Sequence, residues 1–551
     1  MNLQAGFAPH VYNSEIEGLI DEEYPSLKGV TYLDHGGSAI PAKSLLQHVA
    51  SDLSTHLYGN PHSTSTPSAL AGRRVEEVRE QTLRFLGADP QYFDLVFVAN
   101  ATAAMKLVMD SFKDHCEATH KQPRSQRRRF WYGYHRDAHN SLIGVREAAG
   151  GGQHCFDSDQ EVDDWICGAN RKIEKKDKTV RLFGYCGQSN MTGRRLPLSW
   201  SSQIRDSRHT ADVHVLFDAA ALATTTPLDF NNPEQAPDFT CLSFYKMFGF
   251  PDLGALVIRK YSPGARILSS RRYFGGGTVD MVTCLDSSTF HAKKTLNLHD
   301  HLEDGTLPFH SILALSSAIR THTRLFTSMS DISAHTAILT GHMYRGLSSL
   351  HHANGQPVVT VYNDSTAVYG DSRSQGATIA FNVLQRNGMF VAPSTVEQMA
   401  NSRNIFIRSG SLCNPGGAAR YLGWTSMELC ELYKEGLRCS RPSEVIGGRP
   451  TGVVRCSLGA VSTMRDVRSL LEFMEEVFVD YIDEGVRHGP TEAGGGTDTT
   501  VSVRASAEAS IIERNMGKEE RNRGISMLVL SCFLGGRGGG NREKVDKFKE
   551  P

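Results

Sequence analysis

The sequence predicts an α/β protein, with a large domain built on a mixed, mostly parallel sheet and a smaller α/β domain after it. Two patterns predict this architecture. From about residue 26 to 260, short runs of β-branched and aromatic residues alternate with longer amphipathic stretches, as parallel strands with crossover helices require. From about 310 to 480, strand-like and helix-like stretches alternate again. The 551 residues exceed the ~100–200 typical of one domain, so the chain has room for both.

Composition sets the expected boundaries along the chain. We expect an N-terminal segment at 1–27, the large domain at 28–310, the small domain at 311–485 and a tail at 486–551. The tail begins with GPTEAGGGTDTT and ends in a Gly-rich, Lys-rich stretch, which is typical of poorly ordered or atypical segments. Its apolar run, ISMLVLSCFL, is too short to span a bilayer.

The strands of the large domain are expected at the apolar runs, which are 95–100, 181–187, 213–220 and 254–260. Each run ends in a small or polar residue. Because ligands of open α/β sheets bind beyond the carboxyl ends of the strands, we expect the chemistry at these run ends.

The small domain repeats the pattern on a shorter scale. Strands are expected at TVYN, TIAFNVL and GVVRCSLG, and the amphipathic stretch 464–482 predicts a helix.

The overall composition argues against several classes of protein. Lys and Arg number 59 and Asp and Glu 60, with a pI near 7.1, so no nucleic acid or anionic membrane partner is expected. The basic stretch 121–129 is interpreted as a surface insertion. No basic start followed by an apolar run opens the chain, which predicts a cytoplasmic protein without a membrane span. Eleven cysteines without a CxxC pair, and the histidine pairs 299/301 and 351/352 without a third ligand, predict no metal site.

The first candidate for chemistry is Lys246, in the sequence LSFYKMFG. It follows a strand-like run and precedes small or turn-forming residues. A lysine that carries an aldehyde cofactor needs this placement, because its amine must project at a sheet edge, lose a proton and attack a carbonyl. A single lysine of this kind is more often a plain surface residue, so the interpretation depends on companions.

Companions for Lys246 stand at the other strand ends. Asp218 can hold a pyridine nitrogen protonated, and Thr102 lies between a strand and a helix, where hydroxyl and N–H groups hold phosphate. His139 can stack on a pyridine ring, and Asn190 can hydrogen-bond the ring oxygen or the substrate. Each of these residues alone is explained equally well by capping or packing. Their order along the chain predicts a pyridoxal phosphate site, to which Ser243 is also assigned.

The second candidate is Cys413, in the Gly-, Ser- and Pro-rich loop RSGSLCNPGG. A cysteine that carries a persulfide must be accessible, partly ionised and mobile enough to visit a substrate and then an acceptor. A loop of this composition meets those demands. A loop thiol without a role is the alternative, and it loses weight once the cofactor site is accepted.

At this point the residues resemble a known group, the aminotransferase class V branch of fold type I pyridoxal phosphate enzymes, and within it the cysteine desulfurases. TYLDHGGSAIP is similar to the group's opening motif, although His35 and Gly36 replace its usual Asn and Ala. The segment SLGAV follows Arg455, which by resemblance binds the substrate carboxylate. The resemblance covers roughly residues 28 to 480 and implies a pyridoxal phosphate-dependent transferase of fold type I.

A narrower resemblance is to the N-terminal part of the eukaryotic molybdenum cofactor sulfurase family. It rests on Phe-Tyr before Lys246 and on the stretches YGNPHS, YFGGGTV, EDGT and SLCNPGG. In that family the GGGT loop reaches the phosphate of the other subunit's cofactor. The resemblance therefore implies a homodimer in which Thr278 is a cross-subunit phosphate ligand.

The resemblance implies a sulfurtransferase. L-cysteine would bind through Arg455, Cys413 would take its sulfur as a persulfide, and the molybdenum cofactor of xanthine dehydrogenase or aldehyde oxidase type enzymes would receive it. Family members continue into a cofactor-binding C-terminal domain, and nothing after about residue 490 resembles it. The alternatives are a stand-alone cysteine desulfurase or selenocysteine lyase with another acceptor, and a non-catalytic binding partner with this fold.

Overall fold

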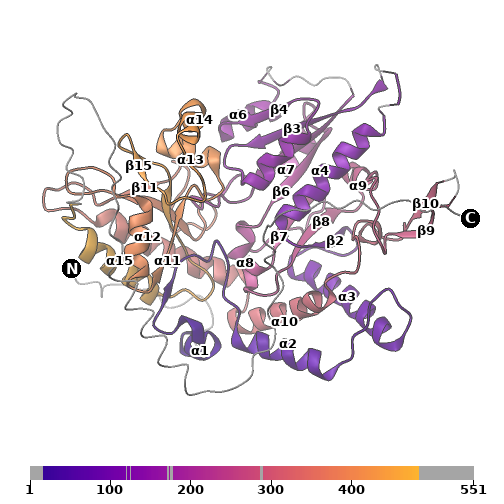
Figure 1. Ribbon diagram of the computed structural model, residues 1–551, viewed down its shortest axis with the longest axis horizontal. Helices are drawn as coiled ribbons and strands as arrows, with labels where there is room; N and C mark the ends of the chain where they lie inside the picture. Colours follow the sequence, from indigo (N-terminus) through magenta and orange to yellow (C-terminus); the bar gives the residue numbers. More distant parts are fainter. Residues whose placement is uncertain are drawn as a thin grey trace, which may run out of the picture. The chain divides into compact units, whose positions relative to one another are not determined.

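A seven-stranded sheet forms the centre of the structure, a computed structural model (Figure 1). Its strand order is β2-β8-β7-β6-β5-β3-β4. The strands are β2 (Phe93–Val98), β8 (Gly254–Arg259), β7 (Phe239–Ser243), β6 (Val213–Asp218), β5 (Thr179–Cys186), β3 (Arg129–His135) and β4 (Gln153–Phe156). Strand β8 runs antiparallel to both of its neighbours, and the other adjacent pairs are parallel. The predicted mixed, mostly parallel sheet is thus confirmed.

The structure describes residues 16–482, except 120, 124, 125, 171, 172, 174–177 and 286–288. These residues belong to one compact unit, and a second unit begins at residue 486. The tail expected at 486–551 and most of the expected N-terminal segment lie outside the described residues. The predicted boundaries at 27, 310 and 485 stay a prediction.

Helices cover both faces of the seven-stranded sheet because its strands alternate between two apolar cores. Leu95 and Phe97 belong to one core, whereas Val96 between them belongs to the other. The first core holds the apolar faces of α3 (Thr66–Phe85) and α10 (Phe309–Phe326), and the second holds that of α4 (Ala101–Glu117). Full burial on both faces explains why the strands read as continuous apolar runs.

A second, four-stranded sheet carries the C-terminal half of the described chain, in the order β11-β12-β17-β14. All its pairs are antiparallel. The strands are β11 (Val359–Tyr362), β12 (Thr378–Val383), β17 (Val453–Ser457) and β14 (Arg408–Gly410). The first three are the strands expected from the sequence; β14 was not expected. The helix predicted at 464–482 is α15 (Met464–Phe478), which starts at a capping box between Thr463 and Asp466.

Helices surround the second sheet, and short elements join the two sheets (Figure 1). The remaining helices are α1 (Ile16–Glu23), α2 (Lys43–Thr55), α5 (Asn140–Ile143), α6 (Asp159–Ile166), α7 (Trp200–Asp206), α8 (Tyr245–Phe248), α9 (Pro263–Leu268), α11 (Met329–Ser349), α12 (Pro393–Asn401), α13 (Pro415–Leu422) and α14 (Ser426–Lys434). The short 3₁₀ helices are η1 (Pro25–Leu27), η3 (Gly144–Ala148), η4 (Leu222–Thr224) and η5 (His299–His301). The remaining strands are β1 (Thr31–Tyr32), β9 (Val279–Thr283), β10 (Phe290–Lys293), β13 (Ile405–Phe406), β15 (Val445–Ile446) and β16 (Arg449–Pro450).

The segment after β1 connects the two sheets. Strand β1 pairs in parallel with β13, the Leu33 side chain is fully buried in the core of the second sheet, and the Ser457 N–H donates to the Leu33 carbonyl. This N-terminal stretch therefore crosses to the smaller sheet before the large sheet begins. Within the described residues, no helix is long and apolar enough to cross a membrane.

Candidate active site

The carboxyl ends of five strands meet at one edge of the large sheet. Because β8 is antiparallel to both β2 and β7, strand β2 points the same way as β7, β6, β5 and β3. These ends lead directly to Thr102, His139, Asn190, Asp218 and Lys246. The topology thus brings the residues predicted from the sequence to the same edge.

Lys246, Asp218 and His139 form the charged centre of this edge. Burial lowers the pKa of Lys246, against the pull of the Asp218 carboxylate. Burial raises the pKa of Asp218, whose carboxylate also accepts a hydrogen bond from the Ala220 N–H at 2.9 Å. Burial lowers the pKa of His139 as well. An amine that gives up its proton readily thus lies within electrostatic range of a buried carboxylate and a neutral imidazole.

Hydroxyl and N–H groups gather beside the start of α4. Thr102 is exposed there, and its Oγ1 lies 2.7 Å from the Oγ of Ser141. The Ser243 hydroxyl accepts a hydrogen bond from the Ala101 N–H at 3.0 Å, and Asn100 caps the helix. A helix N-terminus with adjacent hydroxyls is suited to a phosphate group. Ser141 was not predicted; its only signal in the sequence is its place two residues after His139.

Arg455 lies at the boundary between the two sheets, paired with a residue that the sequence did not single out. One of its terminal nitrogens donates to the Asp34 carboxylate and the other to the Asn190 carbonyl, at 2.8 Å for the latter. Its Nε is buried and has no hydrogen-bond partner among the residues that the structure describes. Arg408 lies 3.8 Å from the same Asp34 carboxylate and is about half exposed, at 47%. The site therefore holds two guanidinium groups where the sequence predicted one.

The Cys413 loop is bonded to the strand-end loops of the large sheet. The Cys413 carbonyl accepts a hydrogen bond from the Asn140 N–H at 2.9 Å, and the Asn190 side chain donates to the Leu412 carbonyl at 2.7 Å. Cys413 itself is exposed. The structure thus brings the predicted cysteine next to His139 and Asn190, which are far from it in sequence.

Thr278 lies apart from this group in the single chain. Its side chain is fully buried, and its hydroxyl donates to the Gly275 carbonyl at 2.7 Å, within its own loop. The loop is held by Asp304, which accepts from the Gly275 N–H at 3.0 Å. The stretches YFGGGTV and EDGT therefore meet in space, but the role predicted for Thr278 stays a prediction.

His35, one of the two departures from the family motif, fits its site closely. It is buried, with its ring edge-on to Tyr32 at 4.8 Å between centroids. A Cβ at Gly459 would lie 2.6 Å from the His35 ring, so the glycine makes room for the imidazole. At Gly36 a Cβ would lie 3.1 Å from the Ser457 hydroxyl, which accepts the Gly36 N–H. The neighbouring residues thus fit a large side chain at position 35 and leave little room for one at position 36.

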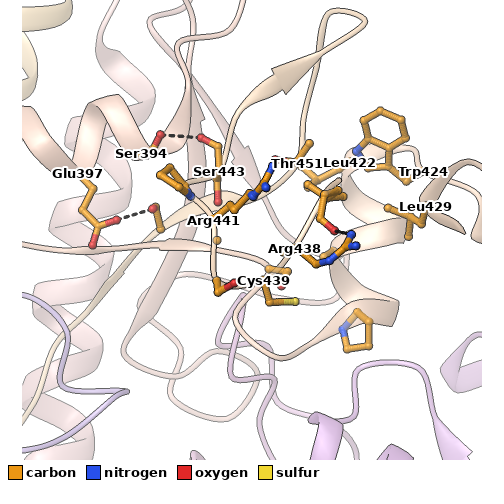
Figure 2. A pocket seen from close by; sticks show the side chains of 18 of the residues that line it. Ser394, Glu397, Leu422, Trp424, Leu429, Arg438, Cys439, Arg441, Ser443 and Thr451 are labelled. Carbon is orange, nitrogen blue, oxygen red and sulfur yellow. Dashed lines mark hydrogen bonds between the residues drawn. The ribbon is translucent and has the colours of Figure 1, made fainter. Parts of the chain in front are cut away.

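A cavity of about 480 Å³ lies behind the Cys413 loop (Figure 2). Its wall includes Ser409, Ser411 and Pro415 from the Cys413 motif, together with Trp424 and Leu429. Figure 2 shows the Glu397 side chain bonded to Ser409 at its edge. Neither Lys246 nor Cys413 lines this cavity, so it is separate from these two candidate residues.

His299 and His301, a pair for which the sequence predicted no metal site, are both buried. His299 binds the Asp94 carboxylate at 2.7 Å. In the described part of the chain, no three or more His, Cys, Asp or Glu side chains lie together in a way that could hold a metal ion.

Comparison with known proteins places this geometry in a family. The sequence pattern of the aminotransferase class-V family matches residues 31–123 and 157–470. A molybdenum cofactor sulfurase from Aspergillus fumigatus (strain Af293) is 50% identical over 471 residues, which are 85% of this chain and 54% of that protein. One from Emericella nidulans is 46% identical over 491 residues, covering 88% of this chain and 56% of that protein. The chain thus spans about half the length of the curated relatives it matches.

Solved structures share the fold. The apo cysteine desulfurase from Thermococcus onnurineus NA1 superimposes with a TM-score of 0.62 at 18% identity, covering 84% of this chain and 98% of that one. The Escherichia coli cysteine desulfurase CsdA gives 0.59 at 17% identity, covering 83% and 97%. The predicted fold, type I of the pyridoxal phosphate-dependent transferases, is confirmed. From the family match across both sheets, the chain belongs to the aminotransferase class-V family.

Proposed function

We propose that the chain is a pyridoxal phosphate-dependent sulfurtransferase that removes sulfur from L-cysteine and passes it to the molybdenum cofactor. One observation carries the proposal. The Cys413 loop is hydrogen-bonded to Asn140 and Asn190, on the same strand-end loops that bring His139 to Lys246 and Asp218. We therefore assign the Cys413 thiol and Lys246, the lysine that would hold the cofactor, to one site.

The residues at the sheet edge fit pyridoxal phosphate. Asp218 supplies a buried carboxylate for the pyridine nitrogen, His139 a ring to stack on the cofactor, and Asn190 an amide for its ring oxygen. Thr102, Ser243 and the start of α4 supply hydroxyls and N–H groups for the phosphate. When bound, the cofactor supplies an electron sink for carbanionic charge on the substrate.

Lys246 has two tasks in this scheme. Burial lowers its pKa, which favours the neutral, nucleophilic amine that would hold the cofactor. With substrate bound, the same nitrogen would be placed to move a proton between substrate carbons. The Asp218 carboxylate favours the charged form of this amine and so offsets the positive charge of the site.

The substrate carboxylate is assigned to Arg455, with Arg408 beside it. Two guanidinium groups around Asp34 leave a net positive charge that attracts a carboxylate. The Asn190 side chain is predicted to contact the substrate as well.

The sulfur transfer follows from the position of Cys413. Its thiolate attacks the sulfur of L-cysteine, a sulfur–sulfur bond forms, and the carbon–sulfur bond breaks with its electron pair left on carbon. That carbon then takes up a proton, and the amino acid leaves as alanine. Cys413 is left as a persulfide.

We assign the persulfide sulfur to the molybdenum cofactor, where it replaces an oxo ligand and activates enzymes of the xanthine dehydrogenase and aldehyde oxidase type. The names of the curated relatives support this acceptor. We further propose a cytoplasmic homodimer. The exposed apolar side chains of the β9–β10 hairpin support the dimer, as argued below.

Two measurements test the proposal. The purified protein with pyridoxal phosphate should absorb near the visible edge, Lys246→Ala should lose this absorbance, and Cys413→Ala should keep it but form no persulfide by mass spectrometry. A colourless wild-type protein would contradict the proposal.

To test the acceptor, the persulfidated protein is offered either a desulfo molybdenum enzyme or an iron–sulfur scaffold protein. Sulfur transfer to the scaffold alone would replace the molybdenum assignment with a stand-alone desulfurase.

A further inference from the structure

Asn414, the residue after Cys413, is the most heavily bonded side chain of the loop. It is fully buried, and its amide nitrogen donates to the Asp137 carbonyl at 3.1 Å, the Asn190 side-chain oxygen at 3.1 Å and the Ser189 hydroxyl at 3.4 Å. Its side-chain oxygen accepts the Gly417 N–H at 3.0 Å and so caps α13. One side chain thus joins the helix after Cys413 to two loops of the large sheet.

The glycines of the CNPGG motif allow this contact. A Cβ at Gly416 would lie 2.3 Å from the Arg136 carbonyl, so the first turn of α13 rests directly on the loop that carries His139. A Cβ at Gly417 would lie 2.8 Å from the Asn414 side-chain oxygen. A larger residue at position 416 would therefore force the helix away from the loop, and one at position 417 would displace the Asn414 side chain.

The backbone before Asn414 is held in an unfavourable conformation. Leu412 and Cys413 have φ values of 57° and 55°, in the left-handed region that residues with a Cβ avoid. Such a conformation persists when surrounding bonds impose it. Here those bonds are the ones from Asn190 to the Leu412 carbonyl and from Asn140 to the Cys413 carbonyl.

The acceptor side of the contact is firmly anchored. The Asp137 carboxylate binds Arg194 at 2.9 Å, and both side chains are buried. Arg194 also binds Asp159 at 2.7 Å, which fixes the loop after β3 to the start of α6. The Asp137 carbonyl therefore presents a fixed point to the Asn414 amide.

We propose that Asn414 is a positioning residue: its amide clasps the Cys413 loop to the loops at 136–140 and 189–190 and so sets where the thiol stands. The clasp consists of hydrogen bonds between uncharged groups, each of modest net strength, so it can open when the persulfide must leave for an acceptor. The clasp itself is inferred from the contacts alone, whereas its effect on persulfide formation rests on the proposed function.

Asn414→Asp separates the two tasks of the side chain. A carboxylate still accepts the Gly417 N–H and suits a helix N-terminus, so α13 keeps its cap. It has no N–H to donate, and it faces the acceptors at Asp137 and Asn190. Gly416→Ala is a second variant, which pushes α13 off the loop without changing a polar group. Thr425→Ala is the matched control: Thr425 caps the next helix, α14, and in the described chain its side chain bonds only to Glu428.

The first readout is hydrogen exchange at the Asn140 amide, which donates to the Cys413 carbonyl. Both clasp variants should exchange about tenfold faster than wild type there, and Thr425→Ala should match wild type. For the second readout, wild type and each variant are mixed with L-cysteine. In both clasp variants the cofactor absorbance should change at the wild-type rate, whereas the Cys413 persulfide should form about tenfold more slowly than in wild type.

If the Asn140 amide exchanged at the wild-type rate in both clasp variants, the clasp would be overturned. Faster exchange with an unchanged rate of persulfide formation would overturn the positioning role. A wild-type protein that forms no persulfide would overturn the proposed function, and the exchange measurement would then decide on the clasp alone.

Discussion

Arg408 is a residue whose importance emerges only from the fold. In the sequence it belongs to the same motif as Cys413, and nothing local distinguishes it from a surface arginine. In the structure it shares Asp34 with Arg455, a residue on the neighbouring strand β17. Asp34 and Arg455 are 421 positions apart, so a pattern read along the chain cannot pair them.

We predict that Arg408→Gln raises the apparent KM for L-cysteine about tenfold or more, because a charge-assisted bond to the carboxylate is lost. Cofactor absorbance should stay as in wild type. The measurement is the rate of alanine release against L-cysteine concentration. Arg403→Gln is the control, since Arg403 forms an exposed ion pair with Glu476. A KM equal to that of wild type would show that Arg408 does not hold the substrate.

His35 predicts a pH dependence of stability. Burial lowers the pKa of His35 from its ordinary 6.5 to about 4. Below pH 6.5 the unfolded chain binds a proton that the folded chain refuses, so this group costs stability as the pH falls. Between pH 7 and pH 5 the loss amounts to about 2 kcal/mol.

We therefore predict that His35→Asn, the change to the usual family residue, flattens the fall in Tm from pH 7 to pH 5. The comparison is between slopes, so a packing defect that lowers Tm at every pH does not obscure it. His351→Asn, at an exposed position, should keep the wild-type slope. A wild-type slope in His35→Asn would mean that His35 is protonated in the folded protein.

At the level of elements, the sequence indicated several of the long, buried strands, but not the strands of two or three residues that depend on a partner. Strands β5 and β6 were predicted because both faces are buried and the residues are apolar throughout. Strand β14, with the sequence RSG, has no such signal and exists because it pairs with β17. Likewise β1 depends on its partner β13. Local composition cannot reveal a strand that only its neighbours stabilise.

The junction of β3, α6 and the loop after β5 depends on one buried cation. Arg194 binds Asp137 and Asp159, and His135 lies 3.2 Å from Asp159. We predict that Arg194→Met lowers the free energy of unfolding by about 3–5 kcal/mol, because it leaves the buried Asp137 carboxylate without its counter-ion. Thermal or urea denaturation measures the change. Arg373→Met removes an exposed pair with Asp371 and should leave the free energy of unfolding close to that of wild type. Similar losses in both variants would contradict a special role for the buried network.

At the level of the whole molecule, the β9–β10 hairpin presents the clearest unpartnered surface. Met281, Val282 and Phe290 are each more than half exposed, and Leu285 and Leu296 reach 78% and 88%. Contiguous apolar side chains of this size mark protein–protein contacts. The hairpin directly follows the loop of Thr278, so a second copy of the chain bound here would lie beside that loop. This arrangement agrees with the homodimer expected from the resemblance.

A dimer with shared sites can be recognised by mixing two inactive variants. If Thr278 of each subunit completes the other subunit's site, a hybrid of Lys246→Ala and Thr278→Ala contains one intact site, made of Lys246 from one chain and Thr278 from the other. Random pairing after co-expression should then restore about a quarter of the wild-type persulfide formation.

The matched control is the pair Lys246→Ala and Cys413→Ala. The carbonyls of Leu412 and Cys413 accept hydrogen bonds from Asn190 and Asn140 of the same chain, so we expect Cys413 to serve the lysine of that chain, and this hybrid should stay inactive. Sedimentation verifies that both hybrids form. Thr278 is fully buried with its hydroxyl bonded to Gly275, so restored activity requires the loop to reorient against the partner. Failure of both pairs would confine Thr278 to its own subunit, and recovery in the control pair would mean that the Cys413 loop, too, crosses the interface.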